Sequence, residues 1–174
     1  MSEDQVFTFL KKRHGLLDAV VISGGEPTLQ SDIVSFCKKL RLLNYKIKLD
    51  TNGSDSGIVR KLISENLIDY IAMDIKTDPA RYGEYFPGSY DPGEIVRSID
   101  VIKSSGVGYE FRTTCISPFI NEEIIRKIGT VINRASMYVL QKFRENRVLD
   151  RNFFDEKERK CSDKDILSFQ KIME

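Results

Sequence analysis

The fold of this chain is indicated by one stretch, AVVISGGEP at residues 19–27. Its first four residues form a continuous run of small and β-branched side chains, which is typical of a strand covered on both faces. Two glycines and a Glu-Pro pair then end the run, as a tight turn at the end of a strand requires. The stretch therefore predicts one strand of a parallel sheet.

Outward from this strand, similar apolar runs alternate with helical patterns. Strands are expected at residues 46–49, 68–75, 109–116 and 137–140, and helices within residues 2–15, 33–43, 58–63, 91–106 and 121–132. Two helix starts carry strong capping signals, Ser2 with Gln5 and Asp91-Pro92-Gly93-Glu94. Such alternation implies right-handed βαβ units, either in an open doubly wound sheet or in part of a β/α barrel. Both architectures gather their chemistry at the carboxyl ends of the strands.

The composition excludes several classes of protein. A chain of 174 residues forms one compact domain, and 27 basic against 26 acidic side chains predict no nucleic-acid partner. No apolar stretch approaches the roughly 18 residues that cross a bilayer. The three cysteines, Cys37, Cys115 and Cys161, are too far apart in sequence for a disulfide framework or a CxxC metal motif. A cytoplasmic protein without a membrane partner is expected.

Two segments differ from this regular pattern. An aromatic loop is expected over residues 77–90, as a lid or a partner surface. A β/α domain is expected over residues 1–150, followed by a charged C-terminal tail with a short helix over residues 151–174. In that tail, Phe153 and Phe154 are expected to dock on the domain.

Unusual polar residues gather at the predicted strand ends. Glu26 with the glycine carbonyls suits an ammonium group, and Lys76 with Arg112 suits a carboxylate, so an amino-acid-like ligand is expected. Structural explanations remain open for most of them: the glycines could form a simple turn, Asp50 and Asp74 could cap helices, and Lys76 could lie on the surface. Arg112 is harder to explain in that way, because an arginine in the middle of a covered strand must pair or face a ligand.

Four motifs in order resemble the radical S-adenosylmethionine (SAM) superfamily. They are GGEPTLQ at residues 24–30, DTNG at 50–53, MDIK at 73–76 and LQKFR at 140–144. Within that superfamily the chain is most similar to glycyl-radical activating enzymes, namely the activating proteins of anaerobic ribonucleoside-triphosphate reductase and of pyruvate formate-lyase. The resemblance covers residues 15–150 and implies a partial (β/α) barrel with about five parallel strands, in an oxidoreductase that uses SAM and a [4Fe–4S] cluster.

The resemblance also implies a role for each residue at the strand ends. Gly24, Gly25 and Glu26 match residues that bind the methionyl ammonium of SAM, whereas Asp50, Thr51 and Asp74 match residues that line its carboxylate and, in some members, a monovalent cation. Lys76 matches a lysine that forms a salt bridge with that carboxylate, and Arg112 matches an arginine near the cofactor. Gln141 stands where the pyruvate formate-lyase branch has a histidine, which favours the reductase-activating branch.

The chain departs from the family in one respect. The family binds its cluster through CxxxCxxC on the loop after the first barrel strand, and no such motif occurs here. We therefore expect the first strand and the cluster loop to be missing, through truncation, a wrong start codon or true degeneration. The three cysteines present are not expected to replace the missing ones, so this chain alone is expected to be inactive.

The complete form is expected to cleave SAM reductively and to generate a glycyl radical on a partner enzyme similar to anaerobic ribonucleoside-triphosphate reductase, with a reductant such as flavodoxin or ferredoxin. Two other functions remain open. The chain could be a non-catalytic scaffold that binds SAM or a partner, and the unpaired edge beside residues 19–23 could support dimerisation. It could also be a lyase that uses Lys76 as a Schiff base with Asp50 or Asp74 as proton shuttle.

Overall fold

The computed structural model describes residues 2–86, 91–144 and 161–174. They contain a five-stranded sheet in the order β1-β2-β3-β4-β5, in which every neighbouring pair is parallel. The strands are β1 (Ala19–Ile22), β2 (Lys46–Thr51), β3 (Tyr70–Asp74), β4 (Gly108–Cys115) and β5 (Tyr138–Lys142). The prediction of five parallel strands in an α/β fold is confirmed.

Helices alternate with these strands. The longer ones are α1 (Glu3–Lys12), α2 (Ile33–Leu42), α3 (Ser56–Ser64), α5 (Pro92–Lys103), α6 (Glu122–Val131) and α7 (Asp163–Met173). The capping box of Ser2 and Gln5 forms at α1 as predicted, and Asp91 caps α5 with Pro92 in the first turn. Both caps are local in sequence, and for that reason the pattern alone locates them.

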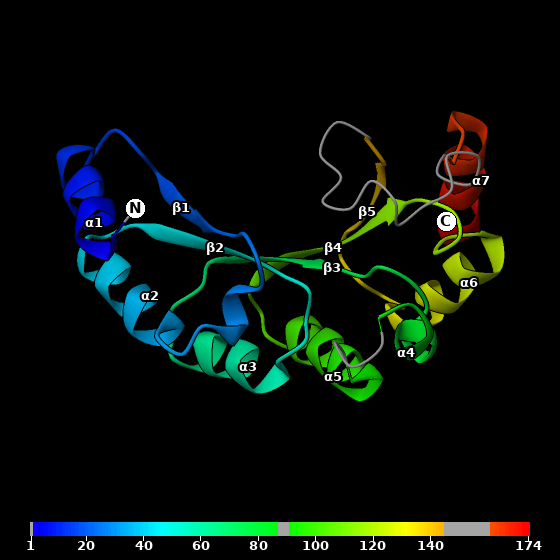
Figure 1. Cartoon of the computed structure of the whole chain (residues 1–174), viewed down its shortest axis with the longest axis horizontal. Coiled ribbons are helices and arrows are strands. Elements are labelled where there is room, and N and C mark those ends of the chain that lie inside the picture. The colour runs from blue at the N-terminus through cyan, green and yellow to red at the C-terminus, as the bar shows by residue number, and fades with distance from the viewer. Residues whose placement is uncertain (1, 87–90, 145–160) are drawn as a thin grey trace.

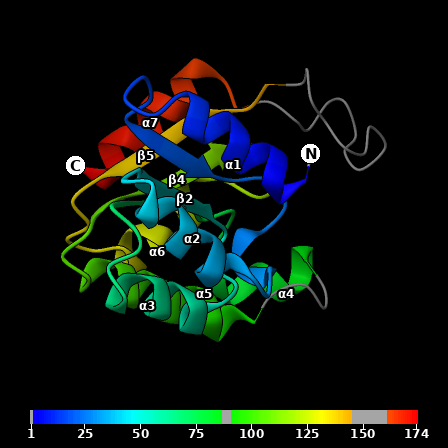
Figure 2. The same cartoon turned by 90° about the vertical axis from the view of Figure 1, so that its left-hand side faces the viewer.

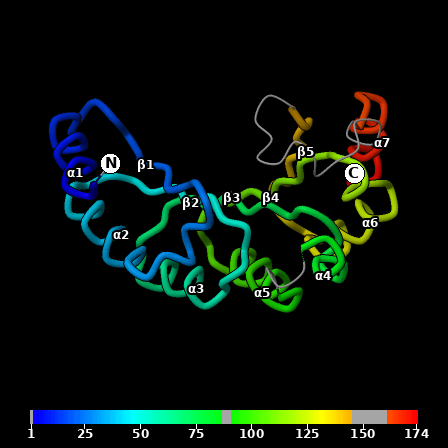
Figure 3. The backbone as a smooth tube through the Cα atoms, in the orientation of Figure 1, coloured from blue at the N-terminus to red at the C-terminus, as the bar shows by residue number. Residues whose placement is uncertain are grey.

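The sheet is bent into a trough, with β1 and β5 rising at its two sides (Figures 1 and 3). Helices α2, α3, α5 and α6 all lie along the outer face of the trough, and a view from the β1 side shows the same layering (Figure 2). A doubly wound sheet places helices on both faces and reverses its strand order at a switch point, whereas this strand order runs without reversal. The arrangement is that of an incomplete barrel whose inner face is open.

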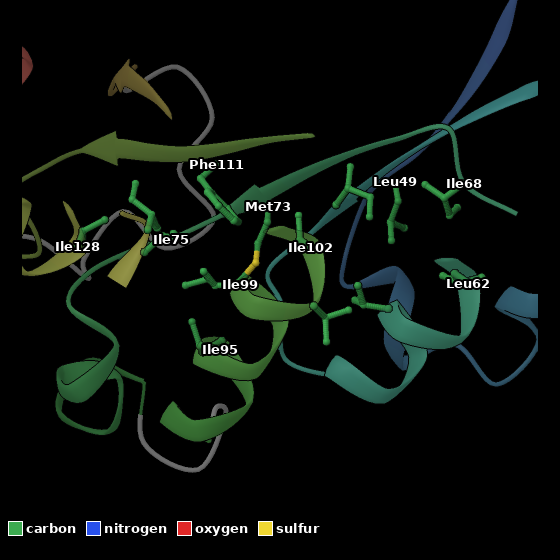
Figure 4. Packing of buried hydrophobic residues seen from close by; sticks show 14 of the residues in the cluster. Leu49, Leu62, Ile68, Met73, Ile75, Ile95, Ile99, Ile102, Phe111 and Ile128 are labelled. Atoms are coloured by element: carbon green, nitrogen blue, oxygen red, sulfur yellow. The ribbon is translucent and has the colours of Figure 1, made fainter. Parts of the chain in front are cut away.

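The hydrophobic core fills the space between the sheet and the outer helices (Figure 4). Met73 and Phe111 point from neighbouring strands toward Ile99 and Ile102 of α5, and all four are fully buried. The residues directly before and after Met73 and Phe111 face the inner side of the trough, because successive side chains along a strand point to opposite faces. One face of each central strand is thus committed to the core, and the other is free to carry polar groups.

The expectation that the first strand is covered on both faces is wrong. Val21 is 54% exposed, while Val20 and Ile22 pack against the core. The reason is that helices form a layer on one face of the sheet only, and β1 is an edge strand. A continuous β-branched run indicates a strand, but it does not distinguish a strand between two layers from one at the rim of an open trough.

The expected aromatic loop is more ordered than its composition suggests. Its first ten residues contain the short helical segments η2 (Pro79–Arg81) and α4 (Tyr82–Tyr85), and residues 87–90 lie outside the described residues. Tyr82 is fully buried, and its hydroxyl accepts a hydrogen bond from the backbone N of Lys76 at 2.8 Å. This part of the segment therefore anchors the end of β3.

The C-terminal helix α7 packs against α6. Phe169 of α7 is buried, and the Ser168 hydroxyl donates to Glu122 Oε1 at 2.7 Å. The expected docking of Phe153 and Phe154 falls on residues outside the described part of the chain. Among the described residues, no helix has the length and apolar character needed to cross a membrane.

Glu94 has a different partner from the one its sequence position suggests. It belongs to the helix-start signal of α5, but Glu94 Oε2 accepts from the backbone N of Ser56 at 2.8 Å, at the start of α3. Hydrogen bonds from Ser56, then from Arg97, lower the pKa of Glu94 to about 2. The carboxylate therefore ties α5 to the N-terminus of α3, where a negative charge is favourable.

We expect Glu94→Gln to lower the free energy of unfolding by about 1 kcal/mol at pH 7, because the amide loses the charge that accepts from Ser56. The carboxylate's pKa is lower in the folded than in the unfolded state, so its stabilisation is complete above the unfolded value near 4.5 and is lost as pH falls toward 2. The free energies of unfolding of wild type and variant, measured in urea from pH 7 down to pH 2, should converge. A difference that persists at pH 2 would contradict the assignment, and Asp100→Asn, exposed on the same helix, is the control.

Candidate functional site

A cavity of about 110 Å³, here called the rim cavity, lies at the carboxyl ends of β1, β2 and β3. Eight of the nine residues predicted from the sequence line it: Gly24, Gly25, Glu26, Asp50, Thr51, Asp74, Lys76 and Arg112. Ser23 and Asn52 complete the lining. The parallel sheet explains this convergence, since the carboxyl ends of all its strands reach the same edge. Gln141 is the exception: it is exposed on β5, pairs in register with Thr114 and does not line the rim cavity.

Gly24 and Gly25 form the wall of the rim cavity above β1. Their φ angles are +89° and +48°, in the left-handed region that side chains other than glycine rarely adopt. A Cβ atom at either position would meet nothing within 4 Å, so the backbone conformation, and not crowding by the protein, requires glycine here. The open space beside both residues lets a ligand approach their backbone closely.

Glu26 braces this turn against the end of β2. Its Oε1 accepts from the Thr28 backbone N at 3.2 Å and from the hydroxyls of Thr28 and Thr51, each at 2.7 Å. Its Oε2 accepts from the Asn52 backbone N at 2.7 Å. These bonds connect β1 to a strand end some 25 residues away, and they hold the glycine turn in place.

Arg112 lies at the centre of the acidic groups of the site. Its Nε donates to Asp74 Oδ1 at 2.8 Å, and its Nη1 is 3.6 Å from Asp50 Oδ2. Burial acts to lower the pKa of Arg112, but Asp74, and then Asp50 and Glu110, raise it by more, so the guanidinium stays charged. Arg112 is thus paired, as a strand arginine whose side chain is only 16% exposed must be.

Asp50 and Asp74 do not act as helix caps. Helix α3 is capped by Asp55, and η2 is capped by Asp78. Asp50 Oδ1 is a buried oxygen without a hydrogen-bond partner among the described residues, 3.6 Å from the Lys48 ammonium. A buried acceptor of this kind suits a ligand that brings its own donor.

A second cavity of about 210 Å³, the aromatic cavity, adjoins the rim cavity and shares Asp74, Lys76 and Arg112 with it. Its remaining lining is mostly apolar and comprises Ile75, Phe86, Thr114, Ile116, Phe119 and Phe143. The rings of Phe86 and Phe119 lie 5.5 Å apart, and the Lys76 ammonium lies 5.6 Å from the Phe86 ring. A polar compartment thus continues into an aromatic one, with Lys76 beside both.

Several residues around this site were not predicted from the sequence. Lys48 and Glu110 contact Asp50 and Arg112 on the inner face, and Tyr82 holds the backbone of Lys76. Period-two alternation could have found the first two, because each lies two residues before a predicted site residue on the same strand. No local signal predicts Tyr82, whose role depends on the path of the chain after β3.

Comparison with known proteins gives the family. The sequence profile of the radical SAM superfamily matches residues 1–135. This chain belongs to the radical SAM superfamily. The "Putative glycyl-radical enzyme activating enzyme" of Methanocaldococcus jannaschii is 35% identical over 141 residues, which cover 78% of this chain and 59% of that protein. The chain therefore spans less than two thirds of the length of this relative.

Two solved structures have the same fold. A domain of pyruvate-formate lyase-activating enzyme from Bacteroides vulgatus superposes with a TM-score of 0.68 at 14% identity, over 90% of this chain and 93% of that one. A radical SAM methyltransferase from Sphaerobacter thermophilus gives a TM-score of 0.65 at 16% identity, over 98% of this chain and 52% of that one. At such identities the likeness concerns the fold alone.

The cysteines of this radical SAM chain do not fit the cluster that the family implies. Cys37, Cys115 and Cys161 are all buried, and burial raises the pKa of Cys37 to about 11 and that of Cys115 to about 12. Thiols with such pKa values are protonated at neutral pH, whereas cluster ligands are thiolates. Within the described part of the chain, no group of three or more histidine, cysteine or acidic side chains could hold a metal ion.

Proposed function

We propose that the rim cavity and the aromatic cavity together bind SAM. One observation carries this proposal: eight residues predicted for that ligand, from the ends of β1, β2 and β3 and from the middle of β4, line one small cavity. Their chemistry fits the ligand. Backbone carbonyls of Gly24 and Gly25 accept from the methionyl ammonium, while Lys76 and Arg112 pair with its carboxylate. Glu26, occupied by its bonds to Thr28, Thr51 and Asn52, keeps the glycine turn in shape.

The aromatic cavity suits the adenosine end of the same molecule. Phe86, Phe119 and Phe143 offer ring faces and edges on which a flat base can stack. The shared residues between the two cavities place this apolar region next to the charged one, as a ligand with one zwitterionic and one aromatic end requires. When bound, SAM supplies a sulfonium centre whose reductive cleavage yields a carbon radical.

We further propose that the whole protein is a glycyl-radical activating enzyme, with a glycyl-radical enzyme as its partner. The name of the 35% identical relative supports this proposal. In this reaction the described residues bind and orient SAM and exclude water from it, and the thiolates of the cluster are not among them. Binding of SAM by this chain should therefore need no iron.

Replacing Lys76 by methionine is expected to weaken SAM binding at least tenfold, because the carboxylate of the ligand loses its ammonium partner. Calorimetric titration of the iron-free chain measures the affinity. Lys103→Met, at the end of α5 and outside both cavities, is the matched control and should bind as the wild type does. A wild-type chain that fails to bind SAM would contradict the proposed function. Trapping of a small carbonyl compound on Lys76 by borohydride would instead favour a Schiff-base lyase.

A further inference from the structure

Four charged side chains form a closed ring on the inner face of the trough, next to the rim cavity. Lys48 and Asp50 come from β2, and Glu110 and Arg112 come from β4. Around the ring, the Lys48 ammonium is 3.3 Å from Glu110 Oε1 and 3.6 Å from Asp50 Oδ1, while Arg112 Nη1 is 3.9 Å from Glu110 Oε1 and 3.6 Å from Asp50 Oδ2. Positive and negative charges therefore alternate, and each group has an opposite charge on both sides.

The ring closes over Ala72 of β3. Ala72 pairs in register with Asp50 of β2 on one side and with Glu110 of β4 on the other. It therefore lies between the two strands that carry the ring, beneath the four charges. Its neighbour Met73 points toward the helices (Figure 4), so Ala72 faces the opposite, inner side of the sheet. Ala72 is nevertheless fully buried. A methyl group leaves room for charged groups of β2 and β4 to meet across β3, whereas a larger side chain would separate them.

Within the ring, the Arg112 guanidinium lies between two opposite charges, those of Asp50 and Glu110. Asp50 is attracted by Lys48 as well as by Arg112, and Glu110 attracts Arg112 toward the middle of the sheet. Without Lys48, Asp50 would have Arg112 as its main counter-charge. Without Glu110, Arg112 would move toward the two aspartates at the rim. Side-chain exposures of 16% for Arg112 and 17% for Glu110 make these attractions stronger than between fully solvated charges.

We propose that Lys48 and Glu110 are positioning residues for the ligand site, which act through Asp50 and Arg112. Neither side chain lines the rim cavity or the aromatic cavity, so any effect on a ligand passes through the two ring members that do. The proposal rests on the binding of SAM proposed above. It adds that the affinity depends on an intact ring of four charges and on the small residue beneath it.

A double-mutant cycle tests the ring. Lys48→Met and Glu110→Gln are each expected to weaken SAM binding about tenfold, in the range of other residues that support ligand-binding groups. The double variant is expected to bind no more weakly than either single one, since each change alone opens the ring. Lys48→Arg keeps the charge and should restore the affinity. Lys46→Met, exposed on the same strand, is the matched control.

Ala72→Val tests the geometry without changing any charge. Valine suits a strand, so the variant is expected to fold, as thermal unfolding would check, while its methyl groups push the ring apart and weaken SAM binding about tenfold. The NMR signal of Arg112 Nε gives a readout that needs no ligand, because this atom donates to Asp74. It should shift in Lys48→Met, Glu110→Gln and Ala72→Val, and stay in place in Lys46→Met.

The outcomes separate the two proposals. A wild-type chain that does not bind SAM overturns the proposed function, whereas the Arg112 signal still tests the ring. A wild-type chain that binds, with unchanged affinity in Lys48→Met and Glu110→Gln, overturns the positioning role. The positioning role is also overturned if the SAM affinity of the double variant falls about a hundredfold, which is the product of two independent effects. An Arg112 signal that does not move in the variants would overturn it as well.

Discussion

Glu26→Gln is expected to lower the free energy of unfolding by about 2 kcal/mol and to weaken SAM binding at least tenfold. The Glu26 carboxylate is acceptor-only, and each of its oxygens faces a backbone N–H, that of Thr28 on one side and that of Asn52 on the other. Whichever way the glutamine amide is turned, its NH₂ group faces one of these donors. One charge-assisted hydrogen bond is replaced by a contact between two donors, which costs more than the loss of a neutral bond.

The effect on SAM binding follows from the same contacts. With Glu26 detached from Asn52 or Thr28, the turn of Gly24 and Gly25 is no longer tied to the end of β2, and its carbonyls lose their fixed direction. Urea unfolding and calorimetric titration measure the two effects. Glu123→Gln, on the surface of α6, is the control and should leave both the stability and the SAM affinity as in the wild type. Wild-type stability in Glu26→Gln would show that the brace is dispensable.

Gly53→Ala is expected to be the most destabilising of these changes, by about 3 kcal/mol. Gly53 follows β2 with a φ angle of +76°, where an alanine is strained. An added Cβ would also lie 2.1 Å from Met73 Cε and 3.2 Å from Ser98 Cβ. Met73 is fully buried beneath the sheet, so its end can move only by disturbing the packing against α5.

Gly106→Ala separates the two causes. Gly106 has a similar φ angle of +72°, but a Cβ there would meet nothing within 4 Å. In this control the free energy of unfolding should fall only by the cost of the left-handed backbone conformation, about 1 kcal/mol. Chemical unfolding of both variants measures the difference, which reports the steric conflict at Met73. Equal losses in the two variants would mean that the core beside Gly53 accommodates the methyl group.

Much of the fold can be predicted from local patterns. The five strands, the cap of α5 by Asp91 and the order of the four motifs depend on residues close together in sequence, so periodicity and turn chemistry suffice to locate them. The convergence of Glu26, Asp50 and Asp74 was also predictable, because parallel strands must end at one edge. In these cases the sequence by itself determines the element and its direction.

The tertiary structure alone decided which groups meet across the sheet. Glu94 accepts a hydrogen bond from the first turn of a helix 38 residues away, and Lys48 reaches Glu110 across the small residue Ala72. Val21 is exposed because the helices form a layer on one face only. These contacts depend on sheet register and on the bend of the trough, which arise from the packing of all five strands together. A local pattern contains no information about such distant partners, and for that reason the charged ring became visible only in the folded chain.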